Sequence, residues 1–284
     1  MSAGDSEHLR AWIGRKESCE DVASAWPVIG LAATLDRRDA EPKPGDSIPP
    51  GWHWLYFLEA KPASELGADG HPKLGGFLPP VGTARRMWAG GRMEFRRALR
   101  IGDRLRRDSE IISIDIKDGR SGKLVFVTVR HVVTASGETA VVEEHDIVYR
   151  EPMKSGEVAP AGKPAPRDPA WRRELVVDPV MLFRYSALTF IGHRIHYDID
   201  YCRQVEGYPG LVVHGPLQTV LILDLCRRHE PRAVKRIDYR ALHPLFHFER
   251  ISVNGNAPTD GSTSEVWTAN AEGNFGMRAT VCFV

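Results

Sequence analysis

The sequence predicts an α+β protein of two units, in each of which an antiparallel sheet curves around one helix. Strand-like runs close each half of the 284-residue chain, and the helical segment 216–228 is apolar on nearly every side. A stretch rich in Pro, Ala and Gly, at 155–169, separates the two halves. A chain of this length can form two domains of ordinary size.

The first half begins with helical patterns over 20–36 and 50–59. Runs rich in Val, Ile and Phe follow at 108–117, 123–134 and 138–150. The turn-forming segments KDGRSG and ASGE separate these runs, and such short connections join neighbouring antiparallel strands. We expect these elements to form an N-terminal unit over residues 1–153.

The second half, 170–284, follows a linker at 154–169 and repeats the order of helix and then sheet, which favours an internal duplication. Its helical segment 216–228, PLQTVLILDLCRR, has the pattern of a helix that is enclosed on all sides. We expect strands at 234–241, 246–253, 264–270 and 277–284, with a turn at 273–276. A sheet wrapped around the enclosed helix is the simplest architecture.

Charge and cysteine content limit the kinds of partner. The 38 basic and 37 acidic side chains nearly cancel, so no overall field favours nucleic acid or an anionic membrane. The four cysteines form no CxxC pair, the opening MSAGDSEHLR lacks the apolar core of a secretory signal, and no run approaches the roughly 18 apolar residues of a membrane helix. We expect a soluble cytoplasmic protein with reduced thiols and a small-molecule partner. A homodimer is also compatible with the sequence.

Unusual polar residues concentrate in 183–217, FRYSALTFIGHRIHYDIDYCRQVEGYPGLVVHGPL. The run His193 to Asp198 has the mixed polarity of a loop that displays side chains. A loop imidazole such as His196 can take up a proton near neutral pH and return it, which is what adding or removing water requires. Asp198 stands two residues further on and is a candidate for orienting that ring.

The end of the same segment predicts a site for a carbonyl oxygen. Gly215 precedes Pro216, and proline suits the first position of a helix. The Gly215 amide and the positive end of the helix dipole would then face a ligand, and glycine allows a close approach. Such an oxyanion hole activates a thioester for chemistry at the neighbouring carbons.

Other interpretations suit these residues singly. A lone histidine is often structural, and Gly-Pro is often an ordinary helix start. HRIHYD with His214 permits a metal site, but no further cysteine or carboxylate spacing supports zinc, and we expect no metal. The aromatic cluster at 52–57 is typical of a core. We find no phosphate loop, dinucleotide fingerprint or GxSxG elbow in the sequence.

HRIHYD together with GYPGLVVHGPL resembles the second half of the hydroxyacyl-thioester dehydratase type 2 family and the related mesaconyl-CoA and itaconyl-CoA hydratases, within the MaoC-like hotdog superfamily. In the first half, LGADGHPKLGGFLPP, RRMWAGGRMEF, SGKLVFVTVRH and EEHDIVYREP are similar to the same family. The resemblance extends from about residue 15 to the end. It implies a double hotdog with a catalytic C-terminal unit and a supporting N-terminal unit.

The resemblance also implies residue roles. His196 matches the family's general base toward water, and the Gly215 amide matches the group that polarises the thioester carbonyl. No metal or redox cofactor is implied, because CoA is part of the substrate. One position departs from the family pattern: Ile191 stands where an amide or carboxylate is expected, and its side chain cannot hold water. Either His193 or Asp198 holds the water instead, or the chain is weakened, or it only binds its ligand.

The sequence therefore predicts reversible hydration of a short branched or dicarboxylic enoyl-CoA, such as mesaconyl-C4-CoA or itaconyl-CoA. His193 and His214 would line the mouth of the site or steady the water. Arg184 or Arg194 would pair with a free carboxylate. Tyr185 and Ser186, which follow Arg184 in the chain, would be a further substrate contact. Two alternatives remain open: a 3-hydroxyacyl dehydratase acting on CoA or acyl carrier protein, and a non-catalytic protein that binds acyl thioesters.

Overall fold

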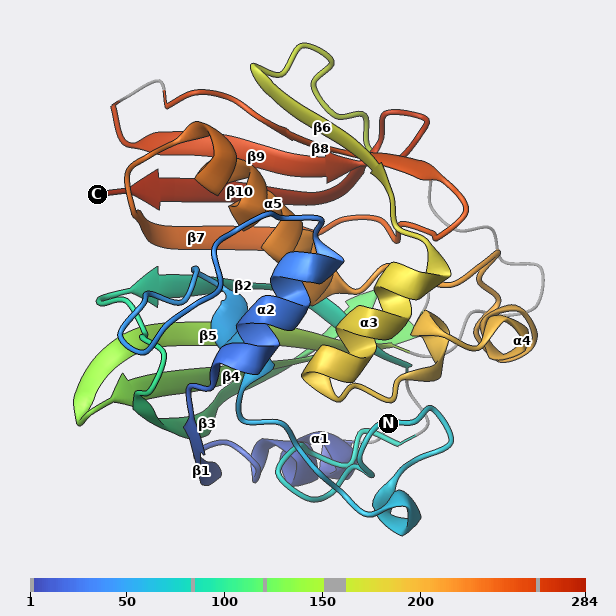
Figure 1. Ribbon diagram of the computed structural model, residues 1–284. Helices are drawn as coiled ribbons and strands as arrows, with labels where there is room; N and C mark the ends of the chain where they lie inside the picture. The colour runs from blue at the N-terminus through green and yellow to red at the C-terminus, as the bar shows by residue number, and fades with distance from the viewer. Residues whose placement is uncertain (1–2, 83–84, 120–121, 151–161, 259–260) are drawn as a thin grey trace.

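A computed structural model describes residues 3–82, 85–119, 122–150, 162–258 and 261–284. Within them the strands form one sheet of ten, in the order β1-β3-β4-β5-β2-β7-β10-β9-β8-β6 (Figure 1). All neighbouring strands are antiparallel. The strands of the first half are β1 (Lys16–Val22), β2 (Arg85–Phe95), β3 (Arg104–Gly119), β4 (Gly122–Ala135) and β5 (Glu138–Arg150). Those of the second half are β6 (Trp171–Val176), β7 (Val234–Ala241), β8 (Arg250–Gly255), β9 (Thr263–Ala269) and β10 (Phe275–Phe283).

The two halves meet edge to edge where β2 pairs with β7. Gly90 lies opposite Arg240 in this pairing, and a Cβ atom on Gly90 would stand 2.4 Å from the carbonyl oxygen of Tyr239. A side chain at Gly90 would therefore push the strands apart. Glycine at this position lets the two halves share a continuous sheet.

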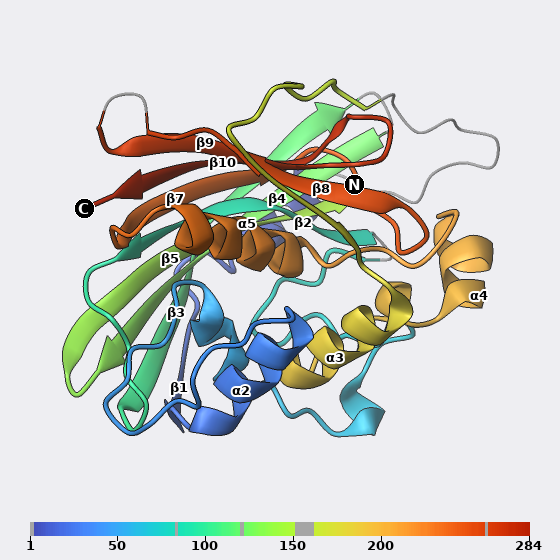
Figure 2. The ribbon, with the colours of Figure 1, turned by 45° about the horizontal axis from the view of Figure 1, so that its top comes forward.

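Three longer helices lie on one face of the sheet (Figures 1 and 2). Helix α5 (Gly215–His229) is enclosed by the second half of the sheet, and all its residues from 217 to 226 are buried. Helices α2 (Ala25–Thr34) and α3 (Pro179–Thr189) lie side by side beyond α5. The shorter elements are α1 (Ala3–Arg10), α4 (Ile199–Tyr201), the 3₁₀ turns η1 (Trp52–Leu55), η2 (Ala63–Glu65) and η3 (Arg194–His196), and the π-helical turn η4 (Cys202–Glu206).

A buried carboxylate ties α5 to the first half of the chain. The Asp224 side chain is fully buried and forms ion pairs with Arg37, Arg173 and Arg228, at 2.5, 2.9 and 2.8 Å. Arg37 follows α2, and Arg173 belongs to β6. The charge network thus joins α5 to elements that pack on both sides of it.

Several predicted elements are confirmed, and others differ from the structure in extent. The strands expected at 108–117, 123–134, 138–150 and 234–241 are present, and 216–228 is α5. The pattern at 20–36 begins instead as strand β1, because residues to Val22 pair with β3. The expected helix at 50–59 is reduced to the four-residue turn η1. The loop expected at 193–198 contains only the short turn η3, and the strand expected at 246–253 begins at Arg250.

The division into two units with a linker at 154–169 stays a prediction, since residues 154–161 lie outside the described residues. The later part of that segment is described, and Pro164 forms a bridge with Asn274. Among the described residues, no helix is long and apolar enough to cross a membrane. The described cysteines are free thiols, and Cys202 and Cys226 are buried.

Candidate active site

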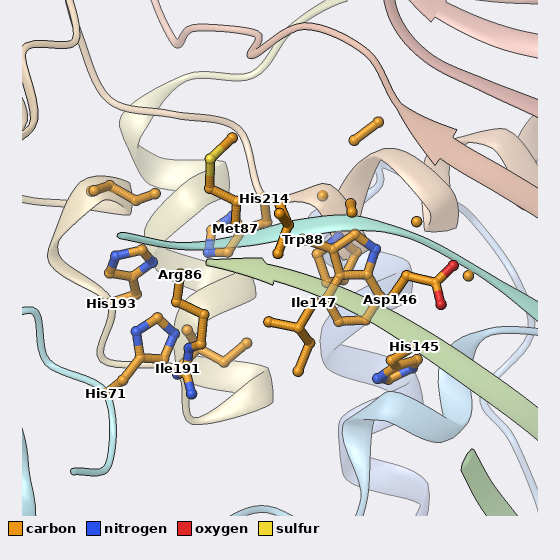
Figure 3. Close-up of a pocket in the computed structure, with 18 of the residues that line it drawn as sticks. His71, Arg86, Met87, Trp88, His145, Asp146, Ile147, Ile191, His193 and His214 are labelled. Atoms are coloured by element: carbon orange, nitrogen blue, oxygen red, sulfur yellow. The ribbon is translucent and has the colours of Figure 1, made fainter. Parts of the chain in front are cut away.

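A cavity of about 2490 Å³ lies between the two halves of the molecule. The second half contributes His193, His196 and His214 to its wall. The first half contributes residues from β2 and β5 and from the loop that precedes β2. Figure 3 shows His71, His193 and Arg86 close together at one end of the cavity, and Trp88, Ile147 and His145 at the other.

His196 is a buried imidazole whose tautomer is fixed. It ends the turn η3, and its Nδ1 lies 2.8 Å from the carbonyl oxygen of Val212. A carbonyl oxygen only accepts, so Nδ1 carries the hydrogen and the lone pair of the neutral ring lies on Nε2. Burial lowers the pKa of His196 to about 3, despite the opposing effect of this hydrogen bond. At neutral pH the ring is therefore an uncharged base.

His214 and Gly215 form the start of α5 beside this base. The His214 ring stacks on His196 with centroids 3.6 Å apart, and its Nε2 is hydrogen-bonded to Ser186 Oγ at 2.8 Å. None of the backbone hydrogen bonds between described residues uses the Gly215 amide as a donor. Because Pro216 has no amide hydrogen, the Gly215 N–H is the foremost free donor of the helix. A carbonyl oxygen bound there would also benefit from the helix dipole.

Three expected side chains do not serve the roles predicted for them. Asp198 does not orient His196: its carboxylate caps α4 by accepting the Tyr201 amide and pairs with Arg194 at 2.7 Å. The guanidinium of Arg194 is engaged by that pair and lies over the Tyr201 ring. Arg184 is exposed on α3 and is not among the cavity residues, because the inward face of the helix carries Tyr185 and Ser186.

The first half brings His71 against the histidines of the second half, and sequence reasoning did not single it out. The ring of His71 lies 4.1 Å from that of His193, and its Nδ1 is 3.0 Å from Asp69 Oδ2. His193 is in turn 5.3 Å from His196, ring to ring. Burial lowers the pKa of both His71 and His193, and the nearby Arg86 guanidinium lowers it further. These rings are therefore neutral at pH 7.

The loop that carries His71 is fitted against the loop that carries His193. Gly70 has φ of 87°, and a Cβ there would lie 1.9 Å from the carbonyl oxygen of Gly192. The Arg194 amide donates to the Asp69 carbonyl at 2.9 Å, and its Nη1 donates to the Ala68 carbonyl at 3.2 Å. Only glycine tolerates both this backbone conformation and this approach. The contact fixes His71 relative to the C-terminal histidines.

Among the described residues, one group of side chains has ligand atoms close enough together to bind a metal ion. It consists of Asp69, His71 and His193. Their nearest donor atoms lie within 4.8 Å of one another. They offer three of the four ligands of a typical zinc site. The positive charge of Arg86, which already lowers the pKa of His71 and His193, opposes the binding of a cation there.

A second polar cluster lies deeper in the first half. Glu143 is 2% exposed, and it is hydrogen-bonded to His53 at 2.9 Å, to Trp54, and to His145. Burial opposes ionisation of Glu143, but the imidazoles of His145 and His53 hold its pKa well below its usual range. A cavity of about 220 Å³ lies against this cluster, and Ile191 contributes to its wall.

A sheet curved around a buried helix, with a neutral imidazole and a free helix-start amide facing one cavity, defines the hotdog-fold enzymes that act on acyl thioesters. The family model of the hydroxyacyl-thioester dehydratases type 2 matches residues 51–247, more than half of the chain. The chain belongs to this family. It is accordingly a hydro-lyase that hydrates enoyl thioesters or catalyses the reverse dehydration.

Named relatives agree with this assignment, and solved structures share the fold. The chain is 45% identical to the mesaconyl-C(4)-CoA hydratase of Chloroflexus aurantiacus, over 93% of this chain and 97% of that protein. It is 28% identical to the mitochondrial hydroxyacyl-thioester dehydratase type 2 of Schizosaccharomyces pombe, over 87% and 93%. A MaoC-like dehydratase from Phytophthora capsici has a similar structure, with a TM-score of 0.72 at 15% identity over 98% of both chains. A Mycobacterium tuberculosis protein with a double hotdog fold superposes with a TM-score of 0.58 at 13% identity, over 96% of both chains. The predicted double hotdog is confirmed.

Proposed function

We propose that this enzyme adds water reversibly to the double bond of a short enoyl-CoA that carries a free carboxylate, such as mesaconyl-C4-CoA. The observation that carries the proposal is the Arg86 guanidinium in the cavity wall beside the neutral histidines. The 45% identity to a mesaconyl-C(4)-CoA hydratase supports the same substrate class. Itaconyl-CoA, another short dicarboxylic thioester, belongs with it as a candidate.

In this reaction His196 Nε2 takes a proton from water while the oxygen of that water bonds to the β-carbon. The electron pair of the double bond moves through the α-carbon onto the thioester oxygen, where the Gly215 amide and the dipole of α5 stabilise the charge. The imidazolium of His196 then returns the proton to the α-carbon. Protons and electrons balance without oxidation, so we propose that no redox cofactor takes part. We also propose that no metal takes part, because the Gly215 amide and the dipole of α5 already stabilise the thioester oxygen.

Arg86 is suited to the free carboxylate because of its position. In mesaconyl-C4-CoA the carboxylate is attached to the carbon that water attacks, so the recognising cation must lie next to the water-activating groups. Arg85 on the same strand pairs with Glu206 at 2.5 Å, and Arg92 pairs with Glu144 and Asp146. No ion pair between described residues uses Arg86, which leaves it available for a bidentate contact.

The rest of the cavity supports a CoA ester. Lys73, Lys117 and Arg150 contribute to its wall, and cations of this kind suit the phosphate groups of CoA. We propose a cytoplasmic enzyme whose partner is the acyl-CoA itself, with neither nucleic acid nor membrane as a partner. A homodimer stays a prediction.

The test is the loss of the ultraviolet enoyl-thioester band with mesaconyl-C4-CoA, itaconyl-CoA and crotonyl-CoA. We expect the wild type to consume a dicarboxylic substrate and His196→Ala to lose about 10²- to 10⁴-fold in kcat. Arg86→Met should raise KM for the dicarboxylic substrate and spare crotonyl-CoA, whereas Arg184→Met, on the exposed face of α3, should change neither. If Arg86→Met lowers kcat/KM equally for the dicarboxylic substrate and for crotonyl-CoA, Arg86 does not recognise the free carboxylate.

Dehydration of a 3-hydroxyacyl thioester is the second candidate. The cavity volume of about 2490 Å³ favours it, because a five-carbon acyl group fills only a small part of that space. Turnover that rises steadily with acyl chain length, and is faster on acyl carrier protein than on CoA, would favour this function over the first. Wild-type protein that binds these thioesters but turns over none of them would be a non-catalytic binder.

A further inference from the structure

The site lacks a polar group at the position where its family resemblance requires one. Ile191 lines the cavity there, and its side chain can neither donate nor accept a hydrogen bond. A water molecule that is activated by His196 alone has only one of its hydrogens held by the protein. A second acceptor must therefore come from another residue if the site is fully active.

The C-terminal unit does not offer a well-held substitute. Asp198 is committed to the Tyr201 amide and to Arg194. His214 has a buried Nδ1 without a partner, but its Nε2 is hydrogen-bonded to the Ser186 hydroxyl, which can donate or accept, so no contact places the lone pair on Nδ1. His193 contributes a ring to the cavity, but no hydrogen bond between described residues fixes which of its nitrogens carries the hydrogen. None of the three presents an acceptor in a defined orientation.

His71 presents such an acceptor. A carboxylate only accepts hydrogen bonds, so the contact between Asp69 Oδ2 and His71 Nδ1 places the hydrogen on Nδ1 and the lone pair on Nε2. The Asp69 carboxylate is itself held, since its Oδ1 accepts the His71 amide at 3.0 Å. The arrangement parallels that of His196, whose Nδ1 is fixed by Val212.

The surroundings of His71 fix its position and its charge. The close approach of Gly70 to Gly192 and the two bonds from Arg194 to the 68–69 carbonyls hold the loop against the catalytic segment. His71 packs against His193 and is close enough to His196 to lower its pKa. Arg86 lies next to it in the cavity wall (Figure 3). A neutral acceptor thus stands between the base and the cation that we assign to the substrate carboxylate.

We propose that His71, oriented by Asp69, is the second water-binding residue of the active site and replaces the polar side chain that position 191 lacks. This inference rests on the proposed hydration. His196 Nε2 and His71 Nε2 each accept one hydrogen of the attacking water; His196 removes its proton, and His71 keeps the oxygen aimed at the β-carbon. His71 is a catalytic residue in this scheme, and Asp69 is its positioning residue.

The test compares His71→Ala, Asp69→Asn, Ile191→Asn and the double variant His71→Ala/Ile191→Asn on the preferred enoyl-CoA. We expect His71→Ala to lower kcat by about 10²- to 10⁴-fold with little change in KM. Asp69→Asn should lower kcat by a smaller factor, because the amide still fits the loop but no longer dictates the tautomer. His8→Ala, which removes an exposed histidine of α1 that is not among the cavity residues, is the control and should leave kcat unchanged.

Rescue separates a water-holding role from a structural one. Adding Ile191→Asn to His71→Ala should raise kcat at least about tenfold above that of His71→Ala, whereas Ile191→Asn alone should add little to the wild type. Thermal unfolding of each variant identifies one that has simply lost its fold. Loss in His71→Ala without rescue, in a folded protein, would overturn the assignment.

Other outcomes are equally decisive. One such outcome is a wild-type protein that shows no activity while the Ile191→Asn variant is active. That result would overturn the role of His71 and leave the proposed chemistry in place. If neither the wild type nor the Ile191→Asn variant consumes any enoyl-CoA, both the proposed function and the role of His71 are wrong. Activity of the wild type that is abolished by a chelator and restored by Zn²⁺ would make Asp69, His71 and His193 metal ligands and overturn the water-binding role.

Discussion

Gly215 combines two requirements at one residue. Its amide is the free donor at the start of α5, and its Cα faces the Trp88 ring so closely that an added Cβ would lie 3.1 Å from the ring atoms. That distance is too short for ordinary packing, so the ring must shift by a few tenths of an ångström if a methyl group is added. Trp88 lines the cavity, and such a shift moves the wall against which a thioester lies.

Replacement of Gly215 by Ala should therefore lower kcat/KM by roughly tenfold while leaving the amide in place. The reason is displacement of Trp88 and not loss of the donor. Steady-state kinetics on Gly215→Ala, Trp88→Phe and the double variant would measure the coupling between the two positions. Losses that simply add in the double variant would contradict the packing explanation.

The sequence was informative about single residues only where they lie near each other in the chain. His196, His214 and Gly215 belong to one segment, and the structure brings them to one cavity. His71 and Arg86 come from the first half, so nothing in local spacing brings them to His196. The family resemblance could have pointed to them, because His71 lies in the segment LGADGHPKLGGFLPP and Arg86 lies in the segment RRMWAGGRMEF.

At the scale of elements, prediction worked where one face of a strand is buried. Strands β3, β4 and β5 follow from alternating apolar residues and short turns. Strand β2 was not predicted, because its sequence RRMWAGGRMEF carries arginines and two glycines that are needed at the joint with β7. Helix α3 was not predicted, although it has an ordinary start, with Asp178 accepting the Met181 amide ahead of Pro179.

The attachment of α5 depends on Asp224, which meets three guanidinium groups without contact with water. Asp224→Ala should lower the free energy of unfolding by about 3–5 kcal/mol, because it leaves three cations crowded and without their common partner. Chemical denaturation measures this loss. Glu174→Ala, which removes a carboxylate from an exposed pair with Arg172, is the control and should scarcely change stability. A similar small effect at Asp224 would show that the network does not hold the helix.

At the scale of the whole molecule, several of the histidines that line the cavity are neutral in the folded protein. Five histidines have pKa values lowered chiefly by burial: His71, His131, His193, His196 and His214. In the unfolded chain each returns to its ordinary pKa of 6.5. Below that pH the unfolded state binds more protons than the folded state, so stability falls as pH falls. Above it both states are neutral and these histidines have no effect.

We therefore expect the free energy of unfolding to decline from pH 6.5 toward pH 4.5, by up to about 1.4 kcal/mol per pH unit for each such histidine. Glu143 acts in a different window: its lowered pKa gives stability that is present above its ordinary 4.5 and is lost only below it. Urea denaturation at half-unit steps between pH 7.5 and 4.5 measures the slope. His131→Gln removes one partly buried histidine, hydrogen-bonded to Ser109 and outside the proposed chemistry, and should make the slope shallower. A stability that is flat across this range would mean that these rings are already charged in the folded enzyme, and His196 could then not be the neutral base that the mechanism needs. An unchanged slope in His131→Gln would mean only that His131 does not contribute to the decline.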